Sequence, residues 1–249
     1  MKLSGKRILI TGGGSGIGLA LARRLASDNQ VVVAGRDEER LRRARADAPT
    51  LFACRLDVLS EDEASDALAW VEGELGGLDV LVNNAGLLRA YALTDADAGA
   101  KTREDVDVNL TATLRMTRLA LPMLRASGAG AIVYISSAVA LAAVPSLSVY
   151  AATKAAVHSL ARSLRLELEP SGIRVFEVLP PVVDTGPVSN LDVPKVSPDA
   201  VAAAMVAGIE RDREEIRVGQ VRSLAVVARV RPSLADRLVI RAFTPGRGA

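Results

Sequence analysis

Hydrophobic positions along the first 180 residues follow two periods in turn. Short apolar runs, typical of buried strands, are each followed by a stretch in which apolar positions recur about every 3.6 residues, as in a helix that faces a core. The predicted strands span residues 7–11, 31–34, 51–56, 79–83, 131–136 and 174–179, and the predicted helices span 16–27, 38–46, 61–75, 103–126 and 150–169. This alternation predicts an α/β fold, a doubly wound parallel sheet with helices on both faces.

The pattern changes where Pro180-Pro181 ends the sixth predicted strand. Residues 182–198 show neither period, and such a long loop in a compact domain is usually functional, so a substrate lid is predicted there. A helix at 199–211 and a short strand at 216–218 follow. The C-terminal extension, residues 221–249, alternates apolar and basic positions. It is either an interface helix pair or a cover for the domain's own core.

Length and composition fit a single domain over residues 1–249. Hydrophobic residues make up 49% of the chain but aromatic residues only 3%, which indicates an aliphatic core. The 31 basic and 29 acidic residues leave a net charge of +2, so no nucleic-acid partner is expected. The chain has no apolar run near the about 18 residues that a membrane helix needs, and its first residues lack an apolar signal core. We therefore expect no membrane partner and a cytoplasmic location.

The chain has one cysteine and one histidine, Cys54 and His158. An internal disulfide and a multi-cysteine metal site are thereby excluded, and no metal is expected. Cys54 lies in an apolar run and is predicted to be a small core residue. His158 lies within a predicted helix, where we expect a packing or surface role.

A glycine-rich turn follows the first strand and opens the first helix. The N–H groups and partial positive charge of a helix N-terminus suit a pyrophosphate, and glycine lets the backbone approach a ligand closely. The spacing differs from G-x-G-x-x-G, so a turn without a ligand stays open at this point. The candidate binding residues are Gly12, Ser15, Gly16, Ile17 and Gly18.

Tyr150 and Lys154 are four residues apart in a predicted helix, so they share one face. A tyrosine with a pKa of about 10 is a poor catalyst at neutral pH, and a nearby ammonium would lower that pKa. Ser137 follows the fifth strand, at the sheet edge where open α/β folds bind ligands. Ser136 is its rival, but side chains along a strand alternate between faces.

These motifs and their order resemble short-chain dehydrogenases/reductases over about residues 6–185. The matching elements are Thr11-Gly-x3-Gly-x-Gly, Asp57, Asn83-Asn84-Ala85-Gly86, Asn109, Ser137 and Tyr150-x3-Lys154. The resemblance implies a Rossmann-like fold and an oxidoreductase that transfers a hydride between a nicotinamide and a carbonyl or secondary alcohol. It selects Ser137 over Ser136 as the residue that binds the substrate oxygen.

The resemblance also implies roles in cofactor binding. Asp57 would hold the adenine amino group beside Val58, and Asn84, Ala85 and Gly86 would line the adenosine ribose. Asn109 would hold a water that connects Lys154 to solvent. Thr185 would bind the nicotinamide carboxamide, with Pro180 and Val183 leading to it. The family often has Pro-Gly after this strand, and Pro180-Pro181 is a stiffer departure from it.

The end of the second strand, Gly35-Arg36-Asp37, bears on the choice of nicotinamide. NAD-preferring relatives carry an acidic residue where this chain has Gly35. A guanidinium at Arg36 can clasp a 2′-phosphate, whereas Asp37 more plausibly caps the next helix. NADP is therefore preferred over NAD, although Ser15 stands where many NADP-preferring relatives have a second basic residue.

The predicted substrate is a small apolar carbonyl compound or alcohol. Its wall is predicted from Leu87, Leu88, Arg89, Tyr91, residues 138–144 and residues 183–191. Arg89 is either a carboxylate anchor or, more plausibly, a solvated loop charge. C-terminal phrases such as residues 179–185 and 215–219 resemble a bacterial subgroup associated by name with D-alanylation of lipoteichoic acid. No reaction follows from that association.

A homodimer or homotetramer is expected from the family, whose helices bearing Asn109 and Tyr150 pack against their copies. Ala155, Ala156 and Ala161 offer small surfaces for such packing. Two alternatives stay open. One is a cofactor-binding regulator without turnover, although a regulator has no need of the intact catalytic set. The other is a nucleotide-sugar epimerase or dehydratase, although those relatives carry a larger substrate domain.

Overall fold

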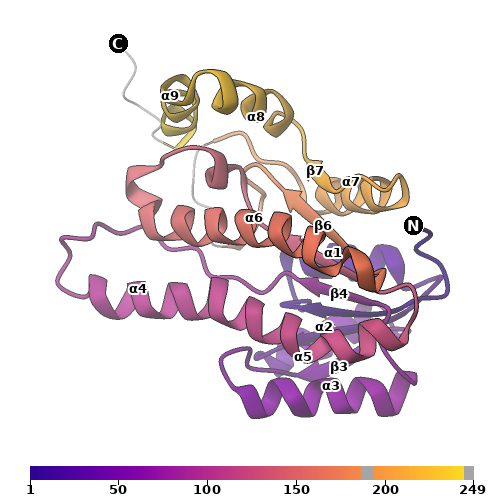
Figure 1. Ribbon diagram of the computed structural model, residues 1–249. Coiled ribbons are helices and arrows are strands. Elements are labelled where there is room, and N and C mark those ends of the chain that lie inside the picture. The colour runs from indigo at the N-terminus through magenta and orange to yellow at the C-terminus, as the bar shows by residue number, and fades with distance from the viewer. Residues whose placement is uncertain (187–192, 244–249) are drawn as a thin grey trace.

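The computed structural model describes residues 1–186 and 193–243 and contains one seven-stranded parallel sheet (Figure 1). The strand order is β3-β2-β1-β4-β5-β6-β7, and each neighbouring pair is parallel. The strands are β1 Arg7–Thr11, β2 Gln30–Gly35, β3 Phe52–Arg55, β4 Val80–Asn83, β5 Ala131–Ile135, β6 Arg174–Leu179 and β7 Glu215–Arg217. The predicted α/β class and parallel sheet are confirmed.

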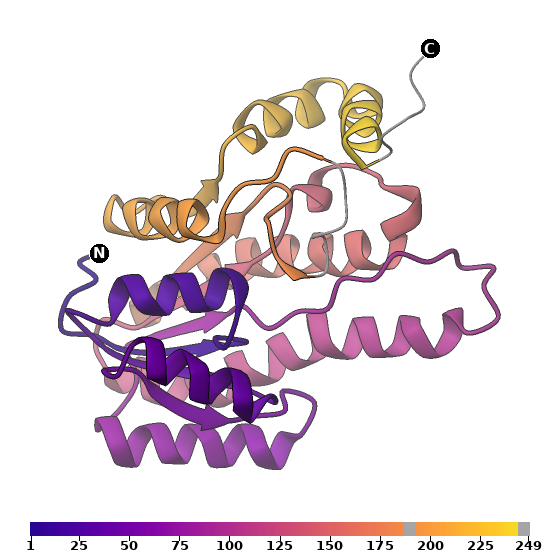
Figure 2. The same ribbon diagram turned by 180° about the vertical axis from the view of Figure 1, so that it is seen from behind.

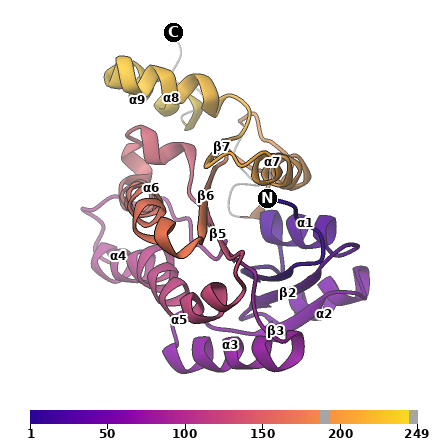
Figure 3. The same cartoon turned by 45° about the vertical axis from the view of Figure 1, so that its right-hand side comes forward.

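Helices cover both faces of the sheet because its strands are apolar on both sides. One layer consists of α1 (Gly16–Leu25), α2 (Glu38–Asp47) and α7 (Pro198–Glu210), and the other includes α3 (Glu61–Leu75), α5 (Ala112–Ala126) and α6 (Ser148–Leu168) (Figure 3). Within β1, Ile8 and Ile10 pack into the first layer and Leu9 into the second. The two cores are therefore built by alternate residues of the same strands.

The helix that precedes β5 differs from its prediction. It begins at Ala98 rather than at residue 103, as α4 (Ala98–Val106), and a π-helical turn over Asp107–Thr111 joins it to α5. Such turns in a helix often mark functional sites. Asn109, a predicted site residue, lies in this turn and is buried.

β1 and β4 are neighbours, so the chain changes direction across the sheet between them. Ligands of open α/β sheets bind outside the carboxyl ends of the strands at such a point. The segment after β6 crosses this edge, and Val183 forms a bridge with Val196. Residues 187–192 of the predicted lid lie outside the described part of the chain.

Two further helices, α8 (Val221–Val230) and α9 (Pro232–Phe243), end the described chain. Figure 2 shows them as a pair beyond the segment that links β6 to α7. They do not extend either layer over the sheet. Among the described helices none is both long and apolar enough to cross a bilayer.

Candidate active site

A cavity of about 790 Å³ lies at the carboxyl edge of the sheet, between the glycine-rich turn and α8. Most of the predicted site residues line it: Gly12, Ser15, Gly16, Ile17, Arg36, Asp57, Val58, Asn84, Ala85, Gly86, Ser137, Tyr150, Lys154, Pro180, Val183 and Thr185. Gly18 and Asn109 are not in its wall. Gly18 packs against Asn84 and Asn109 packs against Gly86, and both of those neighbours line the cavity.

The glycine-rich turn is tightly packed against the end of β4. Gly12 has φ +64°, and a Cβ there would lie 2.9 Å from the Ala85 Cα. A Cβ on Gly18 would lie 2.6 Å from Asn84 Nδ2. That nitrogen donates to the Thr11 and Gly12 carbonyls, each at 3.0 Å. Gly18 therefore makes room for Asn84 rather than for a ligand.

The start of α1 fits a nucleotide pyrophosphate. Ser15 occupies the N-cap position but makes no side-chain capping bond, so the first N–H groups of the helix remain available to a ligand. Gly16 has φ +54°, and a Cβ there would lie 3.1 Å from the Thr185 Cγ2. The segment after β6 thus lies against the turn.

Basic residues surround the end of β2. Arg36 is exposed at the cavity wall, and Arg40 of α2 lines the same region. The Asp37 carboxylate accepts the Arg40 backbone N–H at 3.0 Å and pairs with its guanidinium at 3.0 Å. The expected capping role of Asp37 is present in the structure. Arg40 is a second cation here, which the sequence reasoning did not include.

The Asp57-Val58 loop follows β3. One Asp57 oxygen accepts the Leu59 N–H at 3.0 Å, and the Asp57 N–H donates to Glu63 at 2.8 Å. The Val58 carbonyl accepts from Arg115 at 2.8 Å. These bonds fix the loop at the cavity wall.

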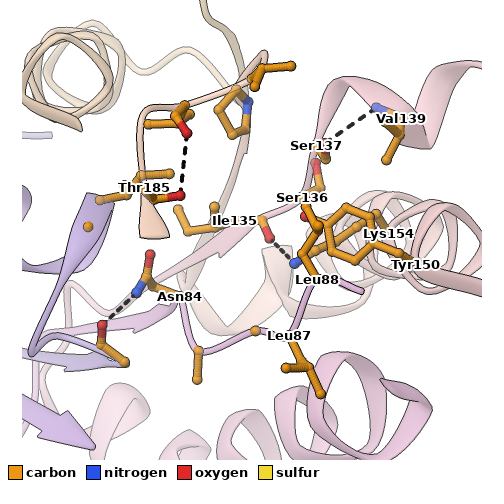
Figure 4. Close-up of a pocket in the computed structure, with 18 of the residues that line it drawn as sticks. Asn84, Leu87, Leu88, Ile135, Ser136, Ser137, Val139, Tyr150, Lys154 and Thr185 are labelled. Atoms are coloured by element: carbon orange, nitrogen blue, oxygen red, sulfur yellow. Dashed lines mark hydrogen bonds between the residues drawn. The ribbon is translucent and has the colours of Figure 1, made fainter. Parts of the chain in front are cut away.

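Tyr150 and Lys154 project from α6 toward the end of β5 (Figure 4). The Lys154 Nζ donates to the Ile135 carbonyl at 2.9 Å and lies 5.6 Å from the centre of the Tyr150 ring. Lys154 is only 5% exposed, and Tyr150 is partly buried. An ammonium and a phenol thus lie close together at the cavity wall, and the ammonium is almost fully buried.

Burial dominates the acid–base properties of this pair. It raises the pKa of Tyr150 to about 12, and a hydrogen bond with Ser137 offsets part of that rise. Burial also lowers the pKa of Lys154 to about 8. The expected lowering of the Tyr150 pKa by Lys154 is therefore not found in the protein alone, where desolvation of the phenolate is the largest influence.

Ser137 and Ser136 point to opposite sides of the β5 end. The Ser137 hydroxyl lies at the cavity and accepts the Val139 N–H at 3.4 Å. Ser136 also lines the cavity, but its hydroxyl donates to the buried Glu177 of β6. Ser137 is consequently the serine that can reach a substrate oxygen.

Asn109 holds the chain segment after β4 in place. Its Oδ1 accepts the Leu87 N–H at 2.8 Å, and its Nδ2 donates to the Leu87 carbonyl at 2.9 Å. A Cβ on Gly86 would lie 3.1 Å from this Oδ1 and 3.5 Å from the Lys154 Nζ. The Asn109 side chain is thus occupied by Leu87, next to Lys154.

The substrate end of the cavity contains residues that the sequence reasoning missed. They come from the end of β7 and from α8 and α9: Gln220, Val221, Ser223, Leu224, Val227, Leu238 and Val239. Leu224 and Val239 belong to a small apolar cluster that also contacts Tyr150. The alternation of apolar and basic positions was the available signal, and it indicated a covered surface without indicating which one.

Some predicted wall residues lie elsewhere. Arg89 pairs with Glu104 at 2.7 Å, and Tyr91 is buried with its hydroxyl 3.2 Å from Thr102. Neither lines the cavity, whereas Leu87 and Leu88 do. Arg89 is a paired charge rather than a solvated one. Cys54 is also only half-buried, because β3 is the edge strand of the sheet.

Comparison with known proteins gives consistent matches. The family model described as short chain dehydrogenase matches residues 6–195. The chain is 36% identical to the uncharacterized oxidoreductase DltE of Bacillus subtilis over 75% of each protein. It is 30% identical to an uncharacterized oxidoreductase of Staphylococcus aureus over 85% of this chain and 94% of that one. These relatives agree with the bacterial subgroup that the C-terminal phrases resemble.

Solved structures give the same result. A short chain dehydrogenase from Burkholderia cenocepacia in complex with NADP superposes with a TM-score of 0.85 at 28% identity, covering 98% of this chain and 100% of that one. A 3-ketoacyl-(acyl-carrier-protein) reductase from Brucella melitensis complexed with NADH gives 0.80 at 27% identity, covering 87% and 98%. The chain therefore belongs to the short-chain dehydrogenase/reductase family and is an NAD(P)-dependent oxidoreductase.

Proposed function

We propose that this protein transfers a hydride between NADP(H) and an apolar carbonyl compound or secondary alcohol. The observation that carries the proposal is the meeting of Ser137, Tyr150 and Lys154 at one cavity whose other end is bounded by Arg36. Under this proposal Asn109, Ser137, Tyr150 and Lys154 are the catalytic set. The remaining predicted residues of the cavity wall bind the cofactor.

In the direction of reduction, the Ser137 hydroxyl donates a hydrogen bond to the carbonyl oxygen of the substrate. Tyr150 then gives its phenolic proton to that oxygen as a general acid. The bound nicotinamide supplies the hydride in reduction and accepts one in oxidation. The Lys154 ammonium stabilises the phenolate left on Tyr150, which regains its proton from solvent through a water near Asn109. A pKa of about 12 keeps Tyr150 protonated before this step.

Three groups at the end of β2 support NADP(H) over NAD(H). Asp37 lines the cavity too, but its carboxylate caps α2 and pairs with Arg40. Arg36 and Arg40 both stand at the cavity wall, where two guanidinium groups suit a 2′-phosphate. Arg40 also supplies a second basic residue, which many NADP-preferring relatives have at the position of Ser15. The named neighbours include one complex with NADP and one with NADH, so they favour neither.

An apolar substrate is supported by the lining of the inner cavity. Leu88, Val139, Leu224, Val227 and Val239 present hydrocarbon next to Tyr150. Each methylene that a substrate buries there contributes about 0.8 kcal/mol to binding. The segment 182–198 would close over the substrate as a lid.

A homodimer or homotetramer through α5 and α6 is part of the proposal. Leu114 of α5 and Leu166 of α6 are 42% and 74% exposed, which suits burial by a second copy. Ala155 is exposed and could allow close helix approach, whereas Ala161 is fully buried in the protein's own core and could not. The cytoplasmic location and an interface role for the C-terminal extension stay predictions.

The first experiment is a fluorescence titration of the protein with NADPH and with NADH, repeated on Arg36→Ala. We expect NADPH to bind more tightly and to weaken about 10- to 100-fold in the variant, while NADH binding changes little. Preferred binding of NADH would overturn the cofactor assignment.

Turnover of a panel of carbonyl compounds and secondary alcohols completes this test, with Tyr150→Phe as the control. We expect the variant to bind NADPH normally and to lose about 10²- to 10⁴-fold in kcat. Nucleotide binding without turnover of any compound by the wild type would favour the cofactor-binding regulator.

A further inference from the structure

Glu177 is a fully buried carboxylate in the middle of β6. Its side chain has a relative exposure of 0% and projects from the sheet face covered by α6, the face that Tyr134 and Ser136 also share. A buried charge is strongly destabilising unless it is paired and hydrogen-bonded. Its partners therefore show what the fold uses it for.

The first partner belongs to β5. The Ser136 hydroxyl donates to the Glu177 Oε1, and the Ser136 backbone N–H donates to the Val178 carbonyl at 2.9 Å. Ser136 stands between two residues of the proposed catalytic site. On one side the Ile135 carbonyl accepts from Lys154, and on the other the Ser137 hydroxyl lies at the cavity.

The second partner belongs to α6. The His158 Nδ1 lies 2.8 Å from the Glu177 Oε2. His158 follows Lys154 by one helical turn, as Lys154 follows Tyr150, so the three side chains lie along one side of α6. The hydrogen bond to Glu177 raises the pKa of His158, which favours an imidazolium paired with the carboxylate.

We propose that Glu177 is a positioning residue for the reaction, a role that rests on the proposed function of the site. Its two oxygens fasten the end of β5, through Ser136, to α6, through His158. These are the two elements that carry Ser137 on one side and Tyr150 with Lys154 on the other. Glu177 thereby sets the distance between the group that binds the substrate oxygen and the group that gives it a proton.

The charges around this pair are few. Glu215 of β7 brings a carboxylate oxygen within 4.8 Å of the ligand atoms of His158 and Glu177, and Arg162 faces His158 from its own helix. Glu215 is itself paired with Arg217 at 2.5 Å. We infer no metal ion here, because each of the three groups already has a hydrogen-bonding partner in the protein.

The test compares two serine variants that make the same chemical change. Ser136→Ala removes a hydroxyl from Glu177. Ser127→Ala removes a hydroxyl that donates to Asp79 at 2.8 Å, at the opposite edge of the same sheet. We expect Ser136→Ala to lower kcat about 10- to 100-fold, as a misplacement of about 1 Å does, with the NADPH dissociation constant within about twofold of the wild type. Ser127→Ala should keep kcat and lose only stability.

His158→Ala provides a second arm from a residue outside the cavity wall, and His158→Gln is its conservative partner. The alanine should lower kcat as Ser136→Ala does, while the glutamine, which can still donate to Glu177, should recover much of it. The double variant Ser136→Ala/His158→Ala should lose little more than either single one, because both act through Glu177. Lower melting temperatures with unchanged kcat in Ser136→Ala and His158→Ala would overturn the proposal.

If the wild type turned over no compound on the panel, the proposed function would be contradicted, but the positioning role of Glu177 would not be decided by kinetics. Crystal structures of the Ser136→Ala and His158→Ala proteins then decide it. Positioning requires that the contact between the Lys154 Nζ and the Ile135 carbonyl, 2.9 Å in the wild type, lengthens or breaks. An unchanged contact in both variants would refute it.

Discussion

Two carboxylates in the same sheet, one at its amino edge and one within β6, are each bonded to a cation and to a serine. At the amino edge, Asp79 is held by Arg7 through a forked pair at 2.9 and 2.8 Å and by Ser127. Within β6, beside the end of β5, Glu177 is held by His158 and Ser136. The chemistry is similar, but the Asp79 carboxylate is partly exposed and pairs with a permanent cation, while the Glu177 carboxylate is fully buried and pairs with a group that titrates.

The two clusters differ in what they support: the Asp79 cluster supports the fold, and the Glu177 cluster also supports the proposed active site. Arg7 also donates to the Gly76 carbonyl at 2.6 Å, so its cluster ties the ends of β1, α3 and β4 together far from the cavity. Loss of this cluster should lower the stability of the protein and leave kcat unchanged. The Glu177 cluster joins the two elements that hold the proposed catalytic groups. Loss of this cluster should therefore lower kcat as well as stability.

The largest change on the structural side should come from Arg7→Met. It leaves Asp79 nearly buried without its cation, which costs about 3 kcal/mol and lowers the melting temperature by about 6–12 °C. Calorimetry would measure this, with kcat at 25 °C expected within about twofold of the wild type. If kcat fell in parallel with stability, the separation between the two edges would not hold.

The dependence of stability on pH should distinguish the clusters next. Burial raises the pKa of Asp79, but bonds from Arg7 and Ser127 outweigh it and hold the pKa well below 3.8. Its contribution is present above pH 3.8 and is lost as pH falls through the lower folded value. His158 has a raised folded pKa, so its contribution is present below pH 6.5 and is lost as pH rises through the folded value.

Melting curves of Asp79→Asn and His158→Gln against the wild type test both signs. The Asp79 difference should shrink only in acid, and the His158 difference should shrink only toward alkaline pH. The opposite trend for His158 would mean that it is neutral in the folded protein.

The smallest effect should be the contrast in stability between the two serine variants. Ser127→Ala should cost about 1 kcal/mol and Ser136→Ala about 2 kcal/mol, because the second leaves an acceptor that water cannot reach. Chemical denaturation would measure the difference. Equal costs would indicate that burial adds nothing to the Glu177 cluster.

The sequence predicted the strands well because each apolar run is short and bounded by turn residues, as Arg7–Thr11 is. The start of α4 at Ala98 was missed since residues 98–102 carry no helical period of apolar positions. Most of the proposed catalytic and cofactor-binding residues before 186 could be placed from motif order, but Arg40 of α2 could not. Those of α8 and α9 could not, because no local pattern states which surface a helix covers.

Glu177 shows the same limit. A glutamate in the apolar strand Arg-Val-Phe-Glu-Val-Leu already demands a buried partner. Which partner it finds depends on the register of β5 against β6 and on how α6 packs over them. The residues next to Glu177 in the sequence determine neither the register nor the packing. His158, which was expected to pack or to face solvent, is one of the partners of Glu177.

The helix pair α8 and α9, here called the roof because its residues bound the substrate end of the cavity, has a consequence for how this protein could diversify. The family model ends at residue 195, whereas the roof begins beyond it at Gln220. Part of the apolar lining at the substrate end is thus encoded apart from the proposed catalytic residues. Drift, exchange or recombination confined to the last stretch could give a descendant a new substrate while it inherits the reaction intact.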